Sequence, residues 1–226
     1  MDIRKNLAVV REQIKNASIA FGRNPDDVTL IGVSKTVDSD AINQSIAYEL
    51  KDFGENRVQE LQDKYDKVEG VRWHMIGQLQ RNKVKYIVDK VSMIHSLDRL
   101  SLAKEINRQA ERINRVVPVL IQVNPANEES KAGLPYDEVI PFIETIYNLK
   151  NIKVMGLMLI APMTEDTETV RPYFSMMKQL FDGIKQDDYP HIEMKHLSMG
   201  MSNDFETAIE EGSTMVRIGT AIFGRK

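Results

Sequence analysis

The sequence predicts an α/β fold, a single (β/α)8 TIM barrel with an additional N-terminal helix. Eight short runs rich in β-branched residues alternate strictly with helical patterns, which is typical of parallel strands joined by helices. These units average about 28 residues each, enough for one strand and one helix. An open doubly wound sheet uses similar units, but the number of strands and the missing GxGxxG motif favour the barrel.

The first element is an amphipathic helix that precedes the barrel. Its apolar stripe consists of Leu7, Val10, Ile14, Ala17 and Phe21, which recur at three- and four-residue spacing, and a glycine follows. The stripe predicts a helix that packs against the barrel.

The strands and helices of the barrel follow in alternation. The predicted strands are Val28–Ser34, Leu50–Phe53, Val71–Ile76, Met93–Ser96, Val119–Asn124, Val154–Leu159, Glu193–Leu197 and Met215–Ile218. The predicted helices are Ser39–Leu50, Arg57–Val68, Asn82–Asp89, Arg99–Ile113, Tyr136–Leu149, Thr167–Ile184 and Asn203–Glu210. The fifth strand is expected to begin after Pro118, because proline cannot donate to a ladder hydrogen bond.

Composition narrows the classes of function. The chain is 42% hydrophobic and 28% charged, and its net charge of −3 without a long Lys/Arg cluster argues against nucleic acid as a partner. The absence of cysteine excludes disulfides, thiolate nucleophiles and zinc–thiolate sites, and fits a reducing compartment. No apolar run resembles a signal peptide or a membrane span. We therefore expect a cytoplasmic protein without a membrane partner, folded as one domain over residues 1–226.

The first candidate for chemistry is Lys35, at the end of the first predicted strand. TIM-barrel active sites are built at the carboxyl ends of the strands, so this amine is expected at the barrel mouth. Considered alone, it is most simply a surface lysine that begins a loop. The functional interpretation is a partly desolvated amine that loses its proton more easily and forms a Schiff base with an aldehyde.

Two further strand ends carry small hydrogen-bond donors. The loop Ser198–Ser202 precedes a helix for which Asn203 and Glu206 predict a capping box, and such a helix N-terminus attracts anions. Gly219 and Thr220 end the eighth strand. Either loop alone could be a simple turn, but their coincidence after strands seven and eight predicts a phosphate site.

Arg217 completes the candidate site. It lies two residues before Gly219, so the alternation of side chains along a strand aims it at the barrel interior. A buried guanidinium requires an acceptor, either a carboxylate or the nitrogen of a heteroaromatic ring. An amine, a phosphate site and an inward guanidinium together are what a pyridoxal phosphate ring requires.

Over nearly its whole length the sequence resembles the pyridoxal phosphate homeostasis proteins, also called the YggS or PROSC family. The motifs that carry the resemblance are Val33–Thr36, Phe53–Glu60, Trp73–Lys83, Ser130–Gly133, Gly156–Met158 and the stretches that begin at Leu197 and Val216. The resemblance implies a barrel of the alanine-racemase type that binds pyridoxal 5′-phosphate.

The resemblance also implies a set of cofactor-binding residues. These are Lys35, Asn56, Ser198, Ser202, Arg217, Gly219 and Thr220. In this set Lys35 forms the Schiff base, Arg217 faces the pyridine nitrogen, and the phosphate is held by Ser202, Gly219 and Thr220. The remaining two residues line the pocket.

Two other residues near the predicted mouth have simpler interpretations. His74 ends the third strand and is most simply an ordinary core or rim histidine. Lys131 lies in the loop after the fifth strand, where a solvated turn is the simplest interpretation and a transient docking point for the cofactor is the alternative. The four histidines include no HxH or HExxH pair, so no metal is expected.

An arginine at the ring nitrogen bears on the class of function. Guanidinium donates a hydrogen bond but cannot accept the ring's proton, so the ring stays unprotonated and is a poorer electron sink. Racemisation would need a second acid–base group, which related racemases take from an additional domain that residues 221–226 cannot supply. We expect no turnover but a monomeric carrier in vitamin B6 homeostasis, which buffers pyridoxal phosphate or delivers it to apoenzymes. The alternatives are an amino-acid racemase without the second domain and, setting the resemblance aside, a Schiff-base aldolase.

Overall fold

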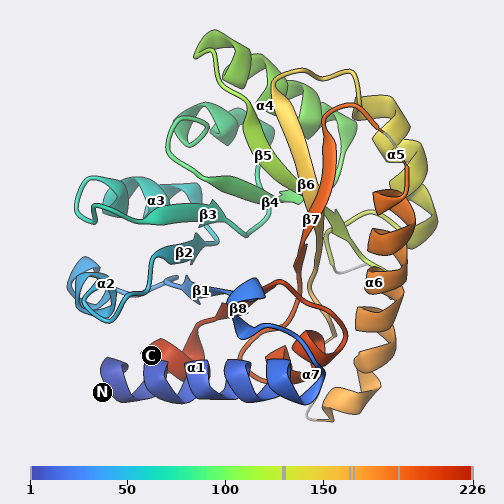
Figure 1. Cartoon of the computed structure of the whole chain (residues 1–226). Helices are drawn as coiled ribbons and strands as arrows, with labels where there is room; N and C mark the ends of the chain where they lie inside the picture. Colours follow the sequence, from blue (N-terminus) through green and yellow to red (C-terminus); the bar gives the residue numbers. More distant parts are fainter. Residues whose placement is uncertain (1, 129–130, 163, 165, 188, 225–226) are drawn as a thin grey trace.

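The barrel predicted from the sequence is present in the computed structural model, which describes residues 2–128, 131–162, 164, 166–187 and 189–224. Each strand pairs in parallel with the next along the chain, and the eighth pairs with the first, which closes the barrel (Figure 1). The strands are β1 (Thr29–Val33), β2 (Asp52–Glu55), β3 (Arg72–Met75), β4 (Met93–Leu97), β5 (Val117–Val123), β6 (Ile152–Leu159), β7 (Ile192–Ser198) and β8 (Met215–Ile218). The predicted (β/α)8 fold is confirmed.

Helices connect the strands on the outside of the barrel. The α-helices are α1 (Ile3–Ala20), α2 (Ser39–Ile46), α3 (Val58–Tyr65), α4 (Leu100–Arg112), α5 (Val139–Ile146), α6 (Arg171–Lys185), α7 (Phe205–Glu210) and α8 (Thr220–Phe223). Short 3-10 turns are η1 (Pro25–Asp27), η2 (Arg81–Tyr86), η3 (Tyr136–Glu138) and η4 (Thr167–Thr169). The helix predicted over Asn82–Asp89 is the 3-10 turn η2, and α8 follows β8 where we predicted no helix.

The fifth strand begins earlier than predicted. β5 starts at Val117 and includes Pro118, which is in register with Lys153 of β6. Its neighbour on the other side, β4, first pairs with β5 one residue later, at Val119. In a parallel ladder successive residues bond alternately to the two neighbours. The missing N–H of proline therefore falls where β4 has not yet begun to pair.

Helix α1 lies across the outside of the barrel and packs against α7 and α8 (Figure 1). Its buried stripe contains Ile3, Leu7, Val10, Ile14 and Ala17, as the apolar spacing predicted. Phe21 does not join this stripe: α1 ends one residue before it, and its side chain is 53% exposed.

One polar contact fastens α1 to the last helix of the chain. The side-chain amide of Asn6 donates to the carbonyl of Ile222 in α8 at 2.9 Å. The N-terminal helix thus supports α8, which follows directly on β8.

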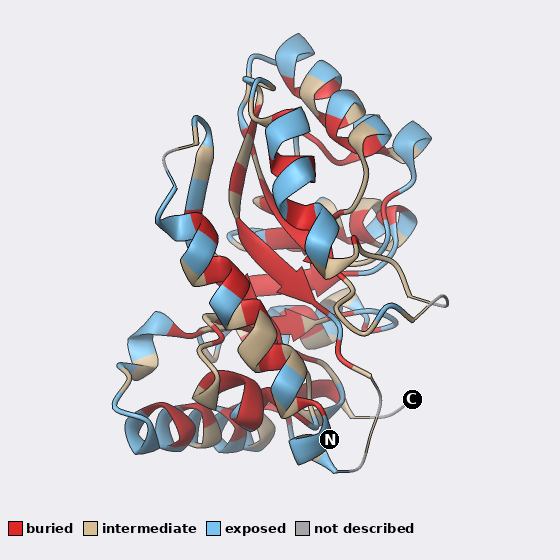
Figure 2. Cartoon of the chain, turned by 90° about the vertical axis from the view of Figure 1, so that its right-hand side faces the viewer, coloured by how far each residue is buried: buried red, intermediate tan, exposed pale blue. Residues whose placement is uncertain are grey.

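Burial divides the molecule into an apolar shell and a mixed interior. Figure 2 shows buried positions along the strands and on the helix faces that cover them, with exposed positions on the outer helix faces. Inside the barrel one apolar cluster consists of Ile31, Met93, Leu120, Met158 and Met215. Buried polar side chains share the interior with this cluster, and they include both histidines of β3 and β4.

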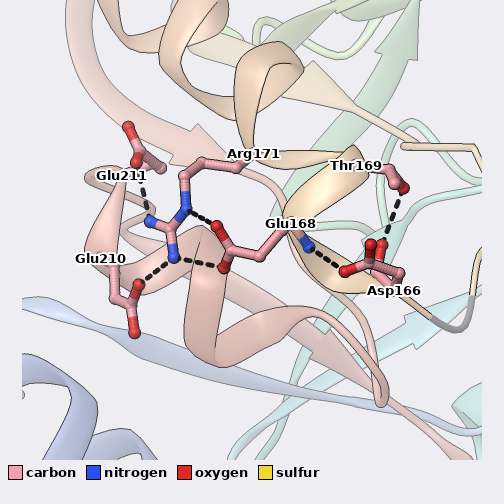
Figure 3. A network of polar contacts seen from close by, with 6 residues as sticks. All are labelled: Asp166, Glu168, Thr169, Arg171, Glu210 and Glu211. Atoms are coloured by element: carbon pink, nitrogen blue, oxygen red, sulfur yellow. Dashed lines mark hydrogen bonds and ion pairs between the residues drawn. The ribbon is translucent and has the colours of Figure 1, made fainter.

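An ion-pair cluster joins the start of α6 to the end of α7 on the outside of the barrel (Figure 3). Arg171 donates to the carboxylates of Glu168, Glu210 and Glu211 at 2.6–2.9 Å. These bonds raise the pKa of Arg171 further above its ordinary value, and the bond to Glu168 contributes most. Asp166 caps the preceding turn by accepting from the Glu168 amide at 3.0 Å. Networks of this kind stabilise a surface junction more than an isolated exposed pair does.

Across the part of the chain that the structure describes, no helix is both long enough and apolar enough to cross a lipid bilayer.

Candidate cofactor-binding site

A cavity of about 370 Å³ opens at the carboxyl ends of β1 and β8. Its volume is within the range of small-ligand pockets. The residues that line it are Val33, Lys35, Thr36, Val37, Asp38, Ala41, Gly219, Thr220, Phe223 and Gly224. The structure therefore brings together Lys35, Gly219 and Thr220, which lie more than 180 positions apart in the sequence. A larger and shallower depression of about 760 Å³ near Lys178 and Thr214 contains none of the predicted site residues.

The turn that carries Lys35 is held from α3. Thr36 has a φ of 62°, a left-handed conformation that costs energy for a residue other than glycine. Its amide donates to the carboxylate of Glu60 at 2.9 Å, and the amine of Lys64 donates to the carbonyl of Ser34 at 2.7 Å. Two α3 side chains thus clamp the backbone on either side of Lys35. Their part in the site was not predicted from the sequence.

A buried ion pair lies directly below this turn. The Lys64 amine donates to Oε1 of Glu55 at 2.7 Å, and the Ser34 hydroxyl donates to the same oxygen at 2.7 Å. Glu55 is fully buried, and its Oε2 has no hydrogen-bond partner among the described residues. Burial raises the pKa of Glu55, although the bonds to Lys64 and Ser34 oppose that shift. The carboxylate depends on Lys64 as its single cationic hydrogen-bond donor in the described structure.

The environment of the Lys35 amine differs from the prediction. We expected partial desolvation, but Lys35 is exposed, because the chain leaves the barrel at Ser34 before it reaches the lysine. The amine stands at the rim of the cavity, accessible to a ligand that enters from solvent.

The opposite wall of the cavity is built by the β8–α8 junction. A Cβ added at Gly219 would lie 3.3 Å from both the Cβ and the carbonyl oxygen of Val33, so glycine leaves room where the two strands approach closely. Thr220 begins α8 and is exposed toward the cavity rim. Ser202 lies beside the same junction, with its hydroxyl 3.5 Å from the Ala221 amide. The loops after β7 and β8 therefore meet as predicted for a phosphate site.

The helix start after β7 is capped differently from the prediction. Asn203 and Glu206 do not form a capping box, because α7 begins at Phe205 with Asp204 as its cap residue. The Asp204 carboxylate folds back to accept from the Met201 amide at 2.5 Å, which shapes the loop instead. Burial raises the pKa of this carboxyl, and the backbone bond from Met201 opposes the shift.

Arg217 points into the barrel, as the strand alternation predicted. It is 4% exposed and donates to the hydroxyl of Ser198 at 2.6 Å and to the carbonyl of Leu159 at 2.8 Å. Neither bonded acceptor is a carboxylate. Burial lowers the pKa of Arg217 to about 10, with the charge of Asp204 acting in the opposite direction. The guanidinium is therefore still charged at neutral pH.

Asn56 and Lys131 lie outside the cavity lining, as do Ser198, Ser202 and Arg217. Asn56 is exposed, and its backbone lies so close to Gly77 that a Cβ there would be 2.3 Å from the Asn56 carbonyl oxygen. Lys131 is half-buried and donates to Glu128 at 3.0 Å. Ser130, part of the motif around Lys131, lies outside the described residues.

The residues at this site fit pyridoxal 5′-phosphate. An accessible amine and a glycine-lined wall border the same cavity, and Arg217, two residues before that glycine, is a buried cation with no carboxylate bonded to it. These groups match an aldehyde, a phosphate and a ring nitrogen, respectively.

Two interior histidines predict that acidification destabilises the fold. Burial lowers the pKa of His95 well below its ordinary value of 6.5 and that of His196 to about 4. Because the unfolded chain takes up protons near pH 6.5 and the folded chain does not, stability is full above that pH and falls as pH drops toward the folded pKa. For fully buried His95 the loss is about 1.4 kcal/mol per pH unit, and it is smaller for half-buried His196.

Urea unfolding at pH 7, 6 and 5 measures this loss. His196→Gln is expected to reduce the slope of stability against pH, whereas His191→Gln, at an exposed histidine, leaves it unchanged. Stability that stays constant from pH 7 to pH 5 would contradict the prediction.

Comparison with known proteins places these features in context. The alanine racemase N-terminal domain family matches residues 3–226. A pyridoxal phosphate homeostasis protein of Aquifex aeolicus is 46% identical, with all of this chain and 99% of the relative covered. A pyridoxal phosphate homeostasis protein of Escherichia coli K12 is 42% identical, with all of this chain and 97% of the relative covered. The structure of PipY from Synechococcus elongatus with PLP bound superposes with a TM-score of 0.86 at 31% identity, covering 99% of this chain and all of PipY.

Proposed function

Because the chain belongs to the pyridoxal phosphate homeostasis protein family, we propose that it binds pyridoxal 5′-phosphate at the barrel mouth and buffers or delivers it. The observation that carries this proposal is the cavity that joins Lys35 to Gly219 and Thr220. The relative with PLP bound shares the fold across nearly the whole chain, which supports the same ligand here.

Each side chain of the site has a proposed role toward the cofactor. When bound, the cofactor supplies a reactive aldehyde, and Lys35 holds it as a Schiff base. Gly219 and Thr220, with Ser202 beside them, bind the phosphate. Arg217 donates to the ring nitrogen. Of the two remaining predicted residues, Ser198 acts on the site through its bond to Arg217. Asn56, exposed directly after β2, is proposed to contact the cofactor from that strand end.

The chemistry of the side chains favours a carrier over an enzyme. Arg217 retains its proton at neutral pH, so it cannot supply the acid that a strong electron sink at the ring nitrogen needs. Among the described residues that line the cavity, the one titratable side chain besides Lys35 is Asp38, and its carboxylate caps α2 by accepting from the Ala41 amide at 2.8 Å. These described lining residues include no tyrosine or histidine, so none of them can act as the second base of a racemase.

The same proposal extends to the state and partners of the protein. Residues 1–226 act as one domain and as a monomer in the cytoplasm, and pyridoxal-phosphate-dependent apoenzymes receive the cofactor. The exposed position of Lys35 at the cavity rim supports such an exchange, because an incoming amine can reach the linkage without opening the barrel.

Two measurements test this proposal. The purified protein is loaded with pyridoxal 5′-phosphate, reduced with borohydride and digested, and peptide mass spectrometry is expected to locate the adduct on Lys35. The loaded protein is then incubated with D- and L-amino acids and, separately, with an apoenzyme. Cofactor transfer without racemisation is the expected result. Racemisation at enzyme-like rates that requires Lys35 would overturn the carrier, and failure to bind the cofactor would overturn the function altogether.

A further inference from the structure

A continuous chain of buried polar side chains crosses the barrel interior and ends at Arg217. Arg217 is bonded to Ser198, and the next side chain in the series is His95, whose Nδ1 is 3.1 Å from the Ser198 hydroxyl. Nε2 of His95 is 2.9 Å from Nδ1 of His74, and Nε2 of His74 is 3.0 Å from Oδ1 of Asp52. All of these residues are buried, and they come from β8, β7, β4, β3 and β2. The two imidazole rings meet edge to face, with centroids 5.1 Å apart.

At the end opposite Arg217, this series of hydrogen-bonded side chains reaches the barrel exterior through an ion pair. Asp52 accepts from Nε and Nη2 of Arg72 at 2.7 and 2.5 Å, and the Arg72 side chain is 58% exposed. Burial alone would raise the pKa of Asp52, but the bonds from His74 and Arg72 outweigh it and lower that pKa. The far end of the chain is therefore a carboxylate that can only accept hydrogen bonds.

With both imidazole rings uncharged, the two ends fix the direction of every bond between them. Arg217 can only donate, so the Ser198 oxygen accepts from it, and the Ser198 hydrogen is then available to Nδ1 of His95. His95, uncharged because its pKa is well below 6.5, carries its hydrogen on Nε2 and donates to His74. His74 in turn donates from Nε2 to Asp52. Donation runs one way, from Arg217 to Asp52, with both rings in the Nε2–H form.

From this geometry we propose that Asp52, His74, His95 and Ser198 form a positioning relay that fixes the Arg217 guanidinium where it meets the cofactor ring. A guanidinium bonded to one hydroxyl and one carbonyl would otherwise be free to rotate toward other acceptors. The relay holds Ser198 in the acceptor orientation and so holds Arg217. It also connects the ring-nitrogen end of the site to the Asp52–Arg72 pair at the barrel exterior.

The relay in the unliganded protein is tested without any cofactor. The test is ¹⁵N NMR of the imidazole nitrogens in the whole chain at pH 7, which distinguishes the two neutral tautomers from imidazolium. Both His74 and His95 are expected to carry their hydrogen on Nε2. A charged His74, or a hydrogen on Nδ1 of His95, would reverse the donation and overturn the proposal.

A pair of variants at the far end tests the direction of the relay. In Asp52→Asn the new amide can donate to His74, so we expect the His74 tautomer to change or to become mixed. Arg72→Gln is the matched control: it removes the exposed partner but leaves the Asp52 carboxylate as acceptor, and both rings are expected to keep their tautomers. Unchanged tautomers in Asp52→Asn would contradict control of the relay by Asp52.

The expected effect of the relay on cofactor binding rests on the proposed function, and it is measured with pyridoxal 5′-phosphate. His95 does not line the cavity, so His95→Leu should act through Ser198 and Arg217 alone. We expect its affinity for the cofactor to fall about tenfold, as when an outer partner of a functional side chain is lost, and the absorption band of the bound cofactor to shift. His95→Gln, which keeps an acceptor for Ser198, should restore part of both.

The outcomes separate the two proposals. If wild-type protein fails to bind the cofactor, the proposed function fails, while the tautomers still decide the relay. If wild type binds and folded His95→Leu binds equally with the same spectrum, the positioning role is overturned. Should His95→Leu not fold, His95→Gln and Asp52→Asn give the same comparison.

Discussion

Lys35→Ala is expected to abolish the borohydride-fixed cofactor adduct and to lower the affinity for pyridoxal 5′-phosphate about 100-fold, or about 2.7 kcal/mol. Among the described residues that line the cavity, this amine is the single group that can bond covalently to the aldehyde in the proposed mode, so the variant keeps only the contacts to the phosphate and the ring. Absorption spectroscopy and equilibrium dialysis measure the two losses.

The fold of this variant should be unaffected. Lys35 is exposed, and substitutions at such positions change stability by about 0.5 kcal/mol or less. Lys131→Ala is the matched control, because Lys131 is another lysine in a loop after a strand but lies outside the cavity lining. It should retain the adduct and the spectrum. An adduct of wild-type yield in Lys35→Ala would show that the covalent site is elsewhere.

Lys64→Met is expected to destabilise the protein by about 3–5 kcal/mol, the range for breaking a buried ion pair by removal of one partner. In wild type the Lys64 amine bonds to Glu55 and to the Ser34 carbonyl, whereas in the variant the buried carboxylate keeps only the Ser34 hydroxyl. Urea unfolding at pH 7 measures the loss. Lys67→Met, at an exposed lysine two residues beyond the end of α3, is the control and should change stability by about 0.5 kcal/mol or less.

Two further experiments identify the cause of the stability lost in Lys64→Met. The double variant Lys64→Met/Glu55→Gln removes the buried charge and should recover part of the stability. Since burial raises the pKa of Glu55 above its unfolded value, this carboxylate takes up a proton more readily in the folded state than in the unfolded chain, and loss of the Lys64 amine strengthens that tendency. The deficit of Lys64→Met relative to wild type should therefore shrink as pH falls from 7 toward 5. A deficit independent of both pH and Glu55→Gln would mean that the loss comes from packing around the methionine.

Periodicity predicted the barrel because each strand and helix is specified by residues close together in the sequence. All eight strands were found near their predicted positions. The errors occur where contacts with another part of the chain determine the local structure. Pro118 belongs to β5 because β4 is not yet paired there. Asp204 bonds to the Met201 amide and is the cap residue of α7, in place of the predicted capping box. The helix α8 was missed because four residues carry no periodic pattern.

The candidate site was predictable in part for the same reason. Lys35, Gly219 and Thr220 end strands, and the rule that strand ends converge at the barrel mouth was enough to bring them together. The clamp on the Lys35 turn was not predictable, because Glu60 and Lys64 lie on a helix and act through the backbone of β1. A signal was present for the relay: His74 and His95 occupy strand positions that should be apolar if they only filled the core.

The closure of the barrel by its first and last strands determines when the cofactor cavity can form during synthesis. β1 leaves the ribosome well before the wall formed by Gly219, Thr220 and α8, which follows it by more than 180 residues. Long-range pairing of this kind completes late in folding. In the proposed binding mode, a nascent chain that carries Lys35 but lacks β8 has the amine without the phosphate site, so we expect cofactor loading only after β8 has paired with β1. Chains that stall before β8, or lose it by cleavage, are therefore expected not to compete for the cofactor.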